Sequence, residues 1–165
     1  MGTFSQLPSH ARIWVYGSNR KFTSDESLAI QEKLNGFTAS WTSHDMPMKA
    51  ESIVLYNQVV VIALDEQVNS ISGCGIDKSV QVMKDLGTAF QANFFDRMLV
   101  YVKTENDLKA YNKAGLQEAI NLGEVDEDSL VLNSMIQKLG EFEQKGFVRL
   151  STFWMAPQLK FLVRA

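Results

Sequence analysis

The stretch VVVIALDE, residues 59–66, decides the fold of this chain, and the segment SISGCGIDK, residues 70–78, follows it after a short loop. The run Val59–Leu64 is unbroken, apolar and rich in β-branched side chains. Such a run is typical of a strand that is central in a sheet or covered on both faces. Asp65 and Glu66 end the run, and small residues then lead to the only cysteine, Cys74, at the expected start of a helix. We therefore expect any chemistry to lie at the end of this strand.

Outward from that strand, the first 103 residues predict the element order β-α-β-β-α-β. A capping box, Thr23-Ser24-Asp25-Glu26, indicates where the first helix begins, and apolar residues at helical spacing extend it to about Trp41. This order is that of the ferredoxin-like split βαβ fold, so we expect an α+β protein with a mainly antiparallel sheet in the strand order 4-1-3-2. The expected strands are 12–16, 51–56, 59–64 and 96–103, and the expected helices are 24–41 and 76–90.

The length of 165 residues fits one domain. We expect the ferredoxin-like core to cover residues 10–103 and an α/β extension, residues 104–165, to pack on it. In the extension the patterns predict a helix over 116–122, closed by Gly123, a strand over 129–132 and a helix over 134–144. Extended segments over 147–153 and 159–163 follow.

Composition excludes several classes of protein. The net charge of −3 and the pI near 5.4 argue against a nucleic-acid partner. A single cysteine excludes an internal disulfide framework and suits a reducing compartment. The N-terminal residues show no secretory signal, and no apolar run approaches the ~20 residues that span a bilayer. We therefore expect a cytoplasmic protein without a membrane partner, in which Trp14, Trp41 and Trp154 are core or interface anchors. A homo-oligomer is compatible with the sequence.

One edge of the predicted sheet gathers most of the reactive side chains: His44, Asp65, Glu66, Cys74 and Asp77. A helix N-terminus favours the thiolate of Cys74, and His44 at the same edge would complete a nucleophile–base pair. The alternative is that Cys74 is a small residue that fills a tight turn. The catalytic candidates are therefore Cys74 and His44.

The carboxylates at this edge suggest a second kind of site. Asp65 and Asp77, with Glu66 beside them, are ligands of the kind that a hard divalent metal uses for phosphoester hydrolysis. The simpler alternative is that Asp77 caps the second helix and that the other two carboxylates end a strand in water. The ligand-binding candidates at this edge are Asp65, Glu66, Ser72, Gly73, Cys74 and Asp77, and no cofactor is indicated.

Two further motifs concern anions. The segment Gly73–Ser79 is not a phosphate-binding P-loop, because Ile76-Asp77 separates the second glycine from Lys78. Ser18 and Arg20 follow the first strand and precede a helix, where backbone amides and a guanidinium can bind an anion. The alternative is a solvated loop in which the arginine pairs with Asp25 or Glu26.

Several phrases resemble a bacterial family of similar length whose members often carry the label "ABC transporter ATPase". The most specific phrase is Ser72-Gly73-Cys74-Gly75-Ile76-Asp77, and the others are at 14–20, 41–44, 95–98 and 141–143. The family has no established activity, so the resemblance implies no catalytic residue. The label itself implies a Walker A loop and an ABC signature, and this sequence has neither.

Two functional hypotheses remain. The first is a non-catalytic module that binds a small molecule or a protein, because no group of residues points to chemistry more strongly than to a structural role, and ferredoxin-like sheets often serve as platforms for partners. The second is a small hydrolase that acts at the edge after the third strand, through Cys74 and His44 or through a metal on Asp65 and Asp77. Whether the chain is an enzyme is left open.

Overall fold

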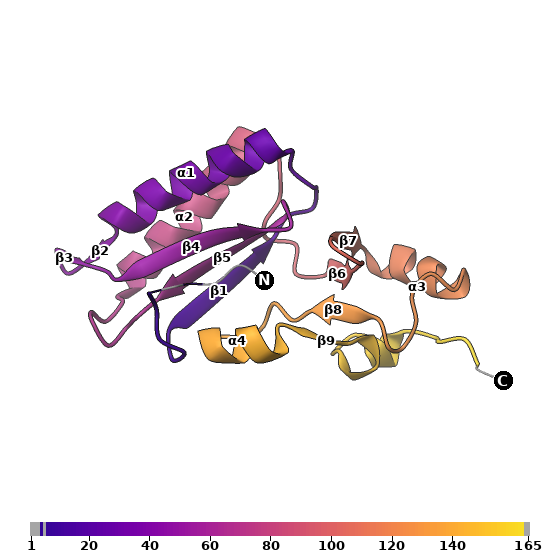
Figure 1. Cartoon of the computed structure of the whole chain (residues 1–165). Helices are drawn as coiled ribbons and strands as arrows, with labels where there is room; N and C mark the ends of the chain where they lie inside the picture. The colour runs from indigo at the N-terminus through magenta and orange to yellow at the C-terminus, as the bar shows by residue number, and fades with distance from the viewer. Residues whose placement is uncertain (1–3, 5, 164–165) are drawn as a thin grey trace.

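The strand β5 (Val59–Leu64) is central, as the apolar run predicts, and all six of its residues are buried. In the computed structural model, which describes residue 4 and residues 6–163, β5 lies between β1 (Arg12–Gly17) and β4 (Ala50–Leu55). Both pairings are antiparallel. The helices α1 (Ser24–Ser40) and α2 (Gly73–Phe90) cover one face of this sheet (Figure 1).

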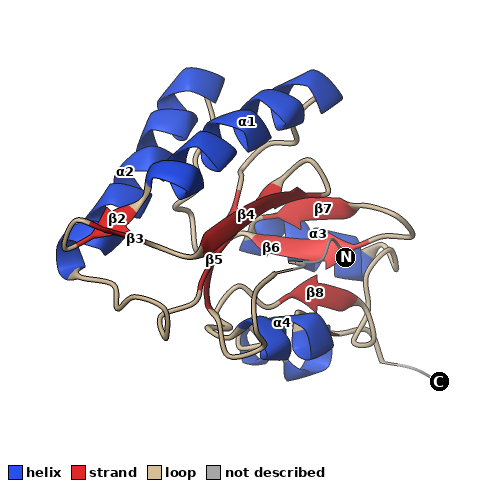
Figure 2. Ribbon diagram, turned by 60° about the vertical axis from the view of Figure 1, so that its left-hand side comes forward, coloured by secondary structure: helices blue, strands red, loops and turns tan. Residues whose placement is uncertain are grey.

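The other face of the sheet is covered by the C-terminal part of the chain (Figure 2). Val60, Ile62 and Leu64 belong to the core on the side of α1 and α2. The alternate residues Val59, Val61 and Ala63 belong to the opposite core, with residues of the C-terminal part. The apolar run is unbroken because successive side chains of a strand point to opposite faces, and here both faces are buried.

A tight turn joins β4 to β5. Tyr56 and Asn57 both have positive φ, at 54° and 53°, and the N–H of Gln58 donates to the carbonyl of Leu55 at 3.0 Å. Two successive left-handed residues form the type I′ turn that suits the twist of a hairpin. The predicted hairpin is confirmed, although its turn residues lie one position earlier than the expected Asn57-Gln58.

The four-stranded ferredoxin-like order is not confirmed, because the fourth strand joins another sheet. The first and third predicted strands, which are β1 and β5 in the structure, are adjacent as expected. β1, however, lies at the edge of the sheet, because among the described residues no fourth strand pairs with it there. β6 (Val100–Lys103) instead pairs with β7 (Leu108–Tyr111), a strand that the sequence patterns did not indicate. Over the described residues, the structure is an α+β fold with antiparallel sheets and four α-helices. The second sheet has the order β7-β6-β8-β9, with β8 at Leu130–Leu132 and β9 at Phe147–Arg149.

A close contact joins β1 to β6 at the point where the two sheets meet. A Cβ atom added to Gly17 would lie 2.3 Å from Cζ of Tyr101, so the ring occupies the space that a side chain would need. The hydroxyl of Tyr101 donates to the carbonyl of Ser18 at 2.9 Å. Burial raises the pKa of Tyr101, and the hydroxyl therefore stays protonated as a donor.

The helix boundaries correct two expectations. Ser72, rather than Asp77, caps α2: its hydroxyl accepts from the N–H of Gly75 at 3.1 Å. The helix expected over 134–144 begins later, as α4 (Leu139–Lys145), so residues 134–138 are extended or turn. No helix of the described residues is long and apolar enough to cross a membrane. The remaining helical elements are α3 (Lys113–Asn121) and two short 3₁₀ turns at Leu150–Thr152 and Ala156–Gln158.

Candidate functional site

The predicted catalytic pair lies on two separate exposed elements. Cys74 is exposed in the first turn of α2. His44 is exposed at the tip of a small hairpin, formed by β2 (Thr42–Ser43) and β3 (Met46–Pro47), and has positive φ. Among the described residues, the two side chains share no hydrogen bond.

The loop before α2 is held by structural hydrogen bonds. The N–H of Ser72 donates to the hydroxyl of Ser43 at 3.1 Å, and the Asn69 amide donates to the carbonyl of Ser43 at 3.2 Å. The indole of Trp41 donates to the carbonyl of Gly75 at 3.0 Å. These bonds fasten the hairpin to the start of α2.

The carboxylates of the predicted metal site turn toward different partners. Asp65 is buried, accepts from the N–H of Gln67 at 3.0 Å and lies 3.4 Å from Nε2 of His10. Glu66 pairs with Arg12 at 3.3 Å, and Asp77 is exposed on α2. Within the described residues, no three His, Cys, Asp or Glu side chains are grouped so that they could hold a metal ion.

At the predicted anion site, Ser18 and Arg20, the polar groups already bind other groups of the protein. Arg20 donates to both carboxylate oxygens of Glu26 and, through Nε and Nη2, to the carbonyl of Phe90. The hydrogen bonds from Arg20, and then the N–H of Thr23, lower the pKa of Glu26 to about 2. Ser18 is fully buried, and its hydroxyl accepts from the N–H of Arg20. The structure therefore matches the alternative reading of this loop, in which Arg20 pairs with Glu26.

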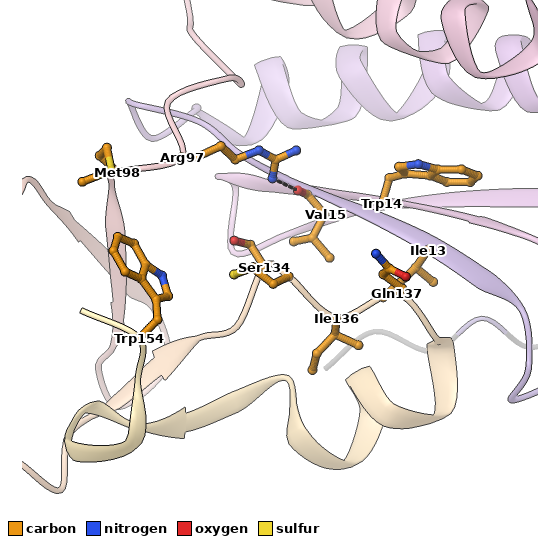
Figure 3. Close-up of a pocket in the computed structure, with 10 residues that line it drawn as sticks. Ile13, Trp14, Val15, Arg97, Met98, Ser134, Ile136, Gln137 and Trp154 are labelled. Carbon is orange, nitrogen blue, oxygen red and sulfur yellow. Dashed lines mark hydrogen bonds between the residues drawn. The ribbon is translucent and has the colours of Figure 1, made fainter. Parts of the chain in front are cut away.

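A groove of about 470 Å³ lies elsewhere, between the free edge of β1 and residues 134–137 (Figure 3). We call it the β1 groove. Its walls come from β1, from the 97–98 loop before β6, from the segment before α4 and from the 3₁₀ region near the C-terminus. The residues that line it are Ile13, Trp14, Val15, Arg97, Met98, Ser134, Met135, Ile136, Gln137 and Trp154.

The backbone of β1 explains why the groove exists. The N–H of Ile13 donates to the carbonyl of Gln137 at 3.0 Å, and the N–H of Leu139 donates to the carbonyl of Ala11 at 2.9 Å. The segment therefore pairs with the first residues of β1 and then diverges. In an antiparallel pair alternate residues point their N–H and C=O groups away from the partner strand, so Val15 presents both groups to the groove. Nη1 of Arg97 covers that carbonyl at 2.9 Å. Outside the strand ladders, the hydrogen bonds of the described residues include none from the N–H of Val15.

Large apolar side chains surround the groove and remain exposed. Met135 is 72% exposed, Met98 51% and Trp154 42%. Arg97 is also exposed, lies 5.5 Å above the ring of Tyr16 and has no ion pair among the described residues. Exposed apolar groups that are gathered around a hollow mark interaction sites more often than scattered ones do.

The sequence patterns missed this groove. Trp154 was expected to be an anchor and Arg97 and Met98 belong to one of the family-like phrases, but none of them was predicted as a site residue. The missed signal is the pairing of 137–139 with β1, which brings residues 97–98, 134–137 and 154 together.

No family model, curated protein or solved structure matches this chain.

Proposed function

We propose that this protein is a non-catalytic binding module and that the β1 groove is its binding site. The observation that carries the proposal is the exposure of Met98, Met135 and Trp154 around a groove of about 470 Å³. Ligand sites are concave, mostly apolar and supplied with a few polar groups that fix orientation. Methionine suits such a site because its flexible side chain adapts to different ligand surfaces.

The chemistry of the lining supports binding rather than catalysis. The lining contains no His, Cys, Asp, Glu or Lys. The guanidinium of Arg97 donates hydrogen bonds and has no acceptor to serve as a general base, and Ser134 has no base in the lining to activate its hydroxyl. The alternative proposal, a small hydrolase at Cys74 and His44 or at Asp65 and Asp77, has less support. Cys74 and His44 share no hydrogen bond among the described residues, and Asp65 is buried against His10 and Gln67 whereas Asp77 is exposed on α2.

An apolar dye tests the location of the site. We expect 8-anilinonaphthalene-1-sulfonate to fluoresce when it binds the folded protein, and Met135→Asp to abolish most of that signal because it places a charge at the mouth of the groove. Met46→Asp is the matched control, since Met46 is 59% exposed on the distant β3 strand. Equal fluorescence of the two variants, both folded by circular dichroism, would place the apolar site elsewhere.

A further inference from the structure

We infer that the occupant of the β1 groove is an extended peptide segment of a partner protein that carries an apolar side chain next to a carboxylate. This inference rests on the proposed function, because it names the class of ligand for the same groove. Three features of the groove carry it: a free backbone donor, an unpaired cation and an open apolar wall.

The backbone donor selects an extended peptide. Residues 137–139 of the chain already pair with Ala11–Ile13, so the edge of β1 accepts an extended segment in this direction. The next outward-pointing N–H is that of Val15, where the segment has diverged. A peptide carbonyl placed there would satisfy this donor and continue the pairing, as in strand addition to a sheet edge.

The charge of the groove selects a carboxylate. Arg97 is the only charged residue of the lining. One of its nitrogens is used by the carbonyl of Val15, which fixes the guanidinium at the rim and leaves Nε and Nη2 for a ligand. These nitrogens form the planar fork that binds a carboxylate with two hydrogen bonds. The net charge of the protein is −3, so it repels an acidic partner. The attraction for a carboxylate is therefore local and comes from Arg97 at the rim of the groove.

The open wall selects a polypeptide over a fatty acid. An aliphatic acid would need an enclosed pocket for its tail, whereas Met135 and Trp154 leave the groove open to solvent along one side. An acidic and apolar peptide matches both the wall and the rim.

A displayed library of random dodecapeptides tests the inference on the full chain. We expect selection on the native protein, with Met135→Asp as the counter-selection, to enrich peptides in which Asp or Glu lies within two residues of a large apolar side chain. In fluorescence anisotropy, Arg97→Gln should weaken the enriched peptides about tenfold, as expected for loss of a charged hydrogen bond. The same peptides with amides in place of the carboxylates should not discriminate between native protein and Arg97→Gln.

Other outcomes would overturn the inference. Enrichment without acidic residues, or no enrichment over Met135→Asp, would exclude the acidic peptide. Binding of sodium dodecanoate that Arg97→Gln abolishes, without peptide enrichment, would identify a small carboxylic acid as the ligand. A dimer in sedimentation that Met135→Asp dissociates, again without peptide enrichment, would identify a second copy. In each of these cases dye binding at the groove would remain, so the proposed function and this inference can fail separately.

Discussion

At the scale of single residues, the contact between Gly17 and Tyr101 fixes how β1 meets the second sheet. Because the added Cβ would lie 2.3 Å from an aromatic carbon, the ring or the strand must move when the glycine is replaced. Stability therefore depends on one missing side chain.

Gly17→Ala should lower the free energy of unfolding by about 1–3 kcal/mol, the usual cost of overpacking a core. Gly36→Ala is the matched control: Gly36 lies inside α1 with nothing near the added Cβ, so alanine should stabilise the protein by about 0.5–1 kcal/mol. Urea unfolding measures both changes. A Gly17→Ala protein as stable as the native one would contradict the described packing.

The pair of Arg20 and Glu26 gives a pH-dependent contribution to stability. The folded-state pKa of Glu26 is lowered to about 2, below that of a free glutamate, so the unfolded chain takes up the proton first as pH falls. The contribution is present above about pH 5 and is lost as pH decreases toward 2. Glu26→Gln should flatten the unfolding free energy over this window, measured by urea titrations at several pH values. Asp25→Asn, which changes the neighbouring residue without touching the pair, should leave the slope intact.

At the scale of elements, two polar residues at the start of α2, Ser72 and Asp77, have different roles. Ser72 accepts from the N–H of Gly75, whereas Asp77 lies exposed within the helix. Ser72→Ala should therefore cost about 0.5–2 kcal/mol of unfolding free energy, and Asp77→Ala should change it by less than about 0.5 kcal/mol. Thermal and urea unfolding test the pair. The reverse order of the two effects would restore Asp77 as the cap.

The sequence correctly predicted the elements that are specified by a few neighbouring residues. The capping box at Thr23 and Glu26 is present in full, and the run Val59–Leu64 is the buried central strand. The sequence patterns did not predict the hairpin of β6 and β7, because its loop, residues 104–107, lacks glycine. The expected strand 96–103 also began four residues before β6. Propensity alone did not indicate that the fourth strand would leave the first sheet, since that choice depends on partners distant in sequence.

At the scale of the whole molecule, the site depends on how the C-terminal part covers the first sheet. Arg97, Met135 and Trp154 meet only because residues 137–139 pair with β1. The sequence directed attention to the edge after β5, where the reactive side chains are dense, and not to this junction. Exposed apolar residues become informative only once the fold shows that they surround the same hollow.

The central claim is that the β1 groove binds apolar ligands, and the seven methionines of the chain allow one direct measurement. In protein labelled with ¹³C at the methionine methyl groups, titration with 8-anilinonaphthalene-1-sulfonate should shift the signals of Met98 and Met135, which line the groove. The signals of Met46 and Met83, on β3 and α2, should stay in place. Shifts confined to Met46 and Met83, or no shift at Met98 and Met135 at saturation, would contradict the account.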